Sequence, residues 1–199
     1  MRRRVHPLLL FVLLLAAAAG WTSLAPSERF LGSGIPIVYL HGAWVWTALI
    51  GLGAASLTGA AGLAFRRPGA HRWSLALGQA GTLFWVTYLP LSLLAMQASW
   101  NGLFLEEPRW RIGVDFAVIG VLLQAAILAI HRPAWASAIN LGFLAALAWS
   151  LAGARQVMHP PSPIFSSESV AIRAFFMGLL ILCLLAGWQL TRWLRARAG

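Results

Sequence analysis

Two histidines in the sequence have the surroundings of ligand side chains. His41 directly follows the apolar run at 37–40, and His159 lies in the stretch Met-His-Pro-Pro at 158–161. Neutral imidazole binds iron, copper and zinc. Neither histidine has a Cys, Asp or Glu near it in sequence, so a closed tetrahedral zinc site would lack its usual ligands. Two imidazoles suffice as axial ligands of a haem iron, and the pair therefore predicts a haem site.

A stretch rich in large apolar side chains, residues 100–110, is the second candidate element. It places Trp100, Phe104 and Trp110 together with two leucines in a short connection. These side chains can form a floor for a flat apolar ligand, and Arg109 and Arg111 can pair with carboxylates such as haem propionates. The alternative is an aromatic belt at the lipid headgroups, which a chain with 11 Trp leaves open.

The composition requires that these residues be positioned by membrane helices. The chain has 199 residues, of which 60% are hydrophobic and 10% charged, and its mean hydropathy is +0.76. An average soluble domain carries roughly 25% charged residues, so a water-soluble globule is excluded. Helices satisfy their own backbone in lipid. We predict one integral membrane domain, 1–199, an all-α polytopic bundle of six transmembrane helices at about 7–21, 37–65, 73–98, 112–130, 134–154 and 174–194.

The charges predict the orientation of this bundle. All 15 basic residues are arginines. One group has no acid beside it and lies at positions 2–4, 66, 67, 72, 132, 192, 195 and 197. By the positive-inside rule this side is cytoplasmic, so both termini are cytoplasmic and the longer loops face outward from a plasma (inner) membrane. The arginines therefore report topology, and no nucleic-acid partner is expected.

The first apolar segment has a second interpretation. An Arg-rich start, a short Leu-rich stretch and the alanines at 16–19 also describe a secretory signal peptide. Cleavage would leave five crossings and move only the N-terminus to the outside.

Several other residues carry structural expectations. His6, His71 and His131 flank the cytoplasmic side beside arginines and are expected to be interfacial, and Cys183 is expected to be a buried thiol. Asp115 is expected to pair with Arg111, four residues before it.

Small residues in the second span, Gly51, Ala55, Gly59 and Gly62, predict a close approach of helix backbones.

The arrangement resembles a known family, the six-span haem-handling proteins of cytochrome c assembly, of the CcmC type. The segment Ile-Val-Tyr-Leu-His at 37–41 resembles the one that holds the first external haem-ligand histidine of that family. Asn140-Leu141, followed by the fifth span and then His159, resembles the approach to the second histidine. The resemblance extends over about 35–195.

The outer loop carries the third match. In the family it runs Trp-Gly-x-Trp-Trp-x-Trp-Asp-x-Arg; here Trp100 matches the first Trp, Glu107 takes the place of the Asp, and Arg109 matches the Arg. Leu103, Phe104 and Glu106 stand where the family has Trp, which makes this loop a degenerate version and the chain a divergent member.

The resemblance implies haem handling rather than enzymatic bond-making. His41 and His159 would hold haem b non-covalently as axial ligands, under a loop that includes Trp100, Phe104, Glu107, Arg109 and Trp110. The implied partners are other cytochrome c assembly membrane proteins or a haem-accepting chaperone. Three alternatives stay open: a haem b subunit of a respiratory complex, a transporter component without haem, and a packing subunit of a complex that binds no ligand.

Overall fold

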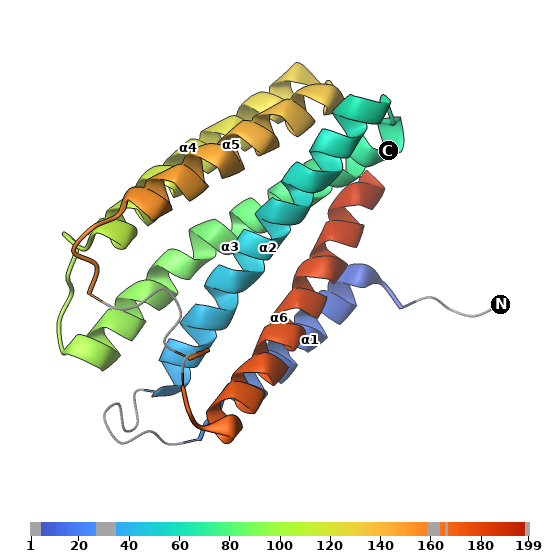
Figure 1. The fold of residues 1–199 in the computed structure, drawn as a ribbon. Helices are drawn as coiled ribbons and strands as arrows, with labels where there is room; N and C mark the ends of the chain where they lie inside the picture. The colour runs from blue at the N-terminus through green and yellow to red at the C-terminus, as the bar shows by residue number, and fades with distance from the viewer. Residues whose placement is uncertain (1–4, 27–34, 159–163, 166, 198–199) are drawn as a thin grey trace.

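The described residues form a bundle of helices (Figure 1). The structure, a computed structural model, describes residues 5–26, 35–158, 164–165 and 167–197. Within these ranges every regular element is an α-helix, which confirms the predicted all-α class. The helices are α1 (Pro7–Thr22), α2 (Ile35–Phe65), α3 (Pro68–Trp100), α4 (Pro108–Ile130), α5 (Pro133–Gly153) and α6 (Val170–Arg197).

Five of these helices, α2 to α6, are long and apolar enough to cross a membrane. Helix α1 is apolar but has 16 residues, which at 1.5 Å per residue is about 24 Å, less than the roughly 30 Å of a hydrocarbon core. Length and composition thus fit a membrane-embedded bundle with five long helices. The predicted six segments correspond to six helices, of which the first is the short one.

The helices pack as three antiparallel pairs. In Figure 1, α2 and α3 lie in the middle, α4 and α5 on one side, and α1 and α6 on the other. The α2–α3 contact is the most extensive in the molecule, and α5 and α6 both pack onto this central pair. The central pair therefore fixes the frame on which the other four helices are placed.

Glycines bring the backbones of α2 and α3 together. A Cβ added to Gly81 would lie 2.9 Å from the backbone nitrogen of Leu52, and one added to Gly51 would lie 3.3 Å from the Cα of Gly81. Further along, Gly59 faces the Ser74 hydroxyl and the backbone of Ser137. The predicted close approach through small residues of the second span is confirmed, with α3 and α5 as its partners.

A buried asparagine links four helices in the interior. Asn140 on α5 is 3% exposed and donates from Nδ2 to the carbonyl and hydroxyl oxygens of Ser74, at 2.9 and 3.2 Å. Its own carbonyl accepts from Ser56 Oγ at 2.9 Å, and its Oδ1 accepts from Gln124 Nε2 at 3.3 Å. Such hydrogen bonds hold helices together where no water competes.

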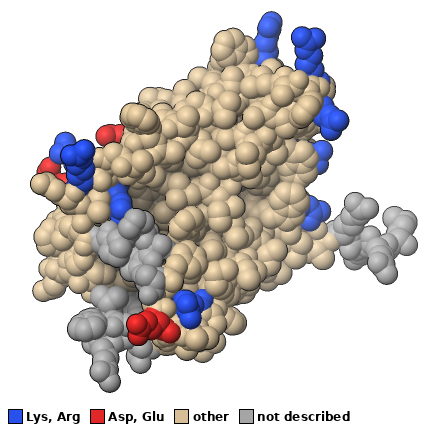
Figure 2. Space-filling model, viewed as in Figure 1, with Lys and Arg blue, Asp and Glu red and all other residues tan. Residues whose placement is uncertain are grey.

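The two ends of the bundle differ in their connections and in their charge. At one end α2 joins α3 and α4 joins α5 through the two-residue turns 66–67 and 131–132, and both ends of the described chain lie there. The other end carries the longer connections 23–34, 101–107 and 154–169. On the visible face, Figure 2 shows arginines alone along the first end and a mixture of acids and arginines at the second.

One sequence expectation was wrong. Arg111 does not pair with Asp115; its Nη1 donates to Glu106 Oε2 at 2.8 Å. Helical side chains lean toward the N-terminus, so Arg111 reaches back into the loop that precedes α4. His71, in the first turn of α3, is half-buried, with its Nδ1 2.7 Å from Ser137 Oγ, because Gly62 leaves room for its ring.

His6, His131 and Cys183 lie where the sequence places them, at helix ends and in the interior respectively. His6 and His131 are exposed at helix ends, where His6 Nδ1 accepts from the Leu8 backbone and His131 adopts a left-handed φ of 56° that ends α4. Cys183 is a free thiol with 0% exposure.

Candidate ligand site at the long-loop end

His41 lies in the second turn of α2, at the end of the bundle that carries the long connections. Its side chain is half-buried and its Nδ1 atom is buried. The imidazole ring lies 6.0 Å from the ring of Tyr88 on α3, with 50° between the two planes. The imidazole is therefore held inside the bundle, against α3, about 9 Å along the helix from its first residue.

A row of contacts between α2 and α3 sets the direction of this side chain. Trp44, one helical turn after His41, donates from Nε1 to Thr87 Oγ1 at 2.8 Å and packs on the Phe84 ring at 4.7 Å. Residues three and four apart share one helix face. The contacts that bring Trp44 to Phe84 and Thr87 thus also bring His41 to Tyr88.

Tyr88 is itself fixed by α4. Its ring packs edge-on against Trp85 at 4.8 Å, and Trp85 Nε1 donates to the Gly113 carbonyl at 3.2 Å. The Tyr88 hydroxyl fills the space in which a side chain at Gly113 would begin. The Trp85–Tyr88 pair therefore forms the surface behind His41, and Tyr88 fits there because residue 113 has no side chain.

Glu107 begins α4 beneath this wall. It is 5% exposed, and its Oε2 accepts from the Trp110 backbone nitrogen at 2.7 Å, which caps the helix. A negative group at this position also favours the helix dipole. Its Oε1 is buried and has no hydrogen-bond partner within the described part of the chain, while the carboxylate acts electrostatically on the Tyr88 hydroxyl.

The loop between α3 and α4 presents apolar side chains outward. Trp100 and Phe104 pack edge to face at 5.6 Å, and a left-handed Asn101, with φ of 51°, turns the chain out of α3. Leu103 and Leu105 are 55% and 50% exposed. This is the surface that the sequence predicts as a floor for a flat ligand.

The predicted basic and aromatic residues at the start of α4 lie beside this loop. Arg109 and Trp110 occupy the first turn of α4 and are half-buried. They share the long-loop end of the bundle with His41, Trp100, Phe104 and Glu107.

The connection after α5 returns to α2 beside His41. A Cβ on Gly42 would lie 3.6 Å from Ile164 Cδ1, and the Phe165 ring packs against Trp46 at 5.8 Å and Phe176 at 5.3 Å. His159, the second predicted ligand, lies outside the described residues.

Sequence reasoning missed Tyr88 and Gly113. The signal for Tyr88 was present: it is a tyrosine within a span, three residues after a tryptophan. Gly113 carried no such signal, because its role depends on which residue of α3 faces it. Among the described residues, no three or more His, Cys, Asp and Glu side chains group as a metal site.

Comparison with known proteins gives no assignment: no protein-family model, curated protein or solved structure matches this chain.

Proposed function

We propose that this protein binds one haem b non-covalently at the extracytoplasmic end of its bundle and holds it for an acceptor in cytochrome c biogenesis. His41 and His159 are the proposed axial ligands. The observation that carries the proposal is the approach of Ile164 to Gly42, where an added Cβ would lie 3.6 Å from Ile164 Cδ1. Ile164 follows His159 by five residues and Gly42 follows His41 by one. Five residues span at most about 18 Å, a length of chain that permits both histidines to bind one ligand.

The residues at this end suit such a ligand. His41 lies at this end with its Nδ1 atom buried and its ring 6.0 Å from the ring of Tyr88. The exposed side chains of Leu103, Phe104 and Leu105 supply an apolar surface for a porphyrin edge. Arg109 supplies a cation for a propionate.

In this proposal the chain does no bond-making. Haem is bound and passed on unchanged, and the protein's residues ligate it, cover it and orient its carboxylates. The acceptor is another cytochrome c assembly membrane protein or a haem-accepting chaperone. Its docking must favour the released state, because a partner with equal affinity for both states shifts nothing.

In the proposed topology the chain crosses the plasma (inner) membrane six times, and both termini lie in the cytoplasm. The arginine-only end, with its two-residue turns, is then cytoplasmic and the haem end extracytoplasmic.

The test is an absorption titration of the purified protein in detergent with haem. The wild-type protein is expected to give the low-spin spectrum of bis-imidazole ligation. His41→Ala and His159→Ala are each expected to abolish it, whereas His131→Ala, which removes an exposed histidine at the opposite end, leaves it intact.

An unchanged haem spectrum in both His41→Ala and His159→Ala would contradict the proposal. Size-exclusion elution of each variant at the wild-type volume separates loss of ligation from loss of fold.

A further inference from the structure

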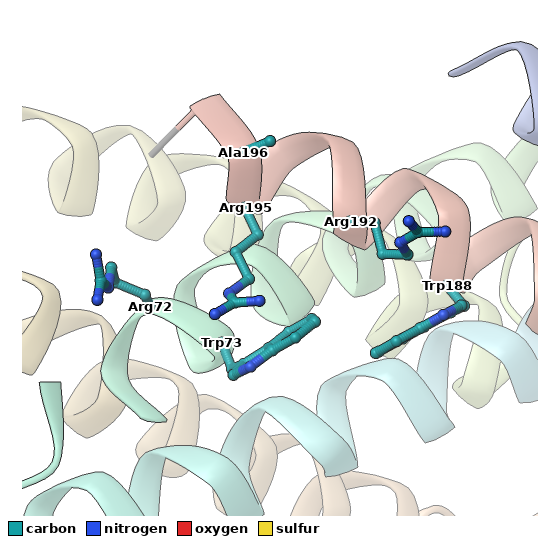
Figure 3. A pocket seen from close by; sticks show the side chains of 6 residues that line it. All are labelled: Arg72, Trp73, Trp188, Arg192, Arg195 and Ala196. Atoms are coloured by element: carbon teal, nitrogen blue, oxygen red, sulfur yellow. The ribbon is translucent and has the colours of Figure 1, made fainter. Parts of the chain in front are cut away.

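A second candidate site lies at the opposite, arginine-only end, between α3 and α6 (Figure 3). It is a cavity of about 410 Å³ lined by Arg72 and Trp73 of α3 and by Trp188, Arg192, Arg195 and Ala196 of α6. No residue of the proposed haem site lines it.

The aromatic wall of this cavity is ordered by stacking. The Trp73 and Trp188 rings lie 5.1 Å apart with only 10° between their planes, and the Arg195 guanidinium sits 4.0 Å from the centre of the Trp73 ring. Figure 3 shows the Arg195 side chain reaching toward the Trp73 ring, with Arg192 of the same helix near Trp188. The Arg195 guanidinium is therefore positioned by the ring, and Arg192 Nη1 donates to Gln189 Oε1 at 2.9 Å.

Within the described part of the chain, no acidic side chain forms an ion pair with these three arginines. The described acids, Glu106, Glu107, Asp115 and Glu168, lie on the loops and helix ends of the opposite half of the bundle, and the ion pair found among the described residues, Arg111 with Glu106, is there too. Guanidinium groups bind phosphate oxygens in a bidentate manner. The cavity thus has the chemistry of a phosphate site.

An apolar groove continues from this cavity toward the bilayer interior. It has a volume of about 240 Å³, lies between α2, α3 and α6, and shares Trp188 with the first cavity. Ile50, Ala54, Leu77 and Leu184 are among its lining residues. Along α6 it runs from Leu184 to Thr191, about 10 Å down the helix.

We propose that the two cavities together bind one anionic phospholipid, with its phosphate at Arg192 and Arg195 and one acyl chain in the groove. A cationic head site that opens onto an apolar groove fits an amphiphile better than a soluble anion. The location, between transmembrane helices at the arginine-rich end, is where acidic lipids meet membrane proteins.

The test measures lipid binding to the full-length protein in a neutral detergent by native mass spectrometry, together with the thermal midpoint. Phosphatidylglycerol is expected to bind and to raise the midpoint, whereas phosphatidylcholine and inorganic phosphate are not. The double variant Arg192→Gln/Arg195→Gln is expected to weaken phosphatidylglycerol binding by about thirtyfold.

The matched control is Arg132→Gln/Arg197→Gln. It removes two positive charges from the same end without touching the cavity, and is expected to leave binding within a factor of about two of wild type. Equal loss in both double variants means unspecific attraction to a charged surface and overturns the proposal. Stabilisation by inorganic phosphate alone means a soluble-anion site and overturns it too.

The groove is tested separately with Ala54→Phe, which fills it, against Ala125→Phe on the exposed side of α4. Ala54→Phe is expected to weaken binding of long-chain phosphatidylglycerol but not of a dihexanoyl form. Unchanged long-chain binding contradicts a seated acyl chain.

Discussion

At the scale of single residues, Glu107 has two candidate roles, one in capping α4 and one in binding a ligand. One carboxylate oxygen caps α4, and the other is buried and makes no hydrogen bond within the described residues. A buried carboxylate without full pairing is costly. Either the cap alone justifies the residue, or the second oxygen serves a bound ligand or partner.

Two substitutions at this position separate those roles. Glu107→Ala removes the cap and is expected to lower the free energy of unfolding in detergent by about 0.5–2 kcal/mol. Glu107→Gln keeps an oxygen for the Trp110 backbone and removes the buried charge, so it is expected to be at least as stable as wild type. If Glu107→Gln preserves stability but loses haem affinity, the charge acts on the ligand; a Gln variant as unstable as the Ala variant contradicts the capping account.

The environment of His41 could be predicted from the sequence only in part. The residue type and its place near the start of an apolar helix were readable from the run at 37–41. Its contact with Tyr88 was not, because that contact depends on how far α2 and α3 slide and rotate against each other. The Gly51–Gly81 approach and the Trp44–Thr87 hydrogen bond decide it.

At the scale of elements, α1 is the helix whose role was least certain from sequence. It packs along α6, where Trp21 Nε1 donates to the Phe175 carbonyl at 3.1 Å and the two rings stack at 5.9 Å. A Cβ on Gly178 would lie 2.8 Å from the Trp21 ring. In the uncleaved chain, α1 is therefore docked on α6 by a fitted contact.

Gly178→Leu tests the docking of α1. The added side chain collides with Trp21 and is expected to lower unfolding stability by about 1–3 kcal/mol. Gly20→Leu is the control, because nothing lies within 4 Å of a Cβ at that position. The intact mass of the purified protein is expected to be 21.5 kDa; a shorter product, with Gly178→Leu as stable as the control, would support cleavage instead.

The helix boundaries show how far apolar runs predict elements. Each predicted segment became a helix, but α3 begins at Pro68 rather than near 73, and α6 extends over 170–197 rather than 174–194. Hydropathy marks where lipid contact ends, whereas backbone hydrogen bonding continues into the polar interface. A proline at the first helical position, as in α3, α4 and α5, marks the true starts better.

At the scale of the whole molecule, the separation of charge between the two ends is the main feature. It predicts a single orientation, which the lone buried cysteine makes easy to measure, since Cys183 should not react. In right-side-out vesicles, Leu103→Cys is expected to react with a membrane-impermeant maleimide, and Arg132→Cys only after permeabilisation. The reverse pattern would place the proposed haem end in the cytoplasm.

The two-residue turns at 66–67 and 131–132 have one more consequence. They leave a protease almost no flexible chain to cleave between α2 and α5 on that side. If this end is cytoplasmic as proposed, limited digestion of inside-out vesicles should therefore spare these four helices as one fragment.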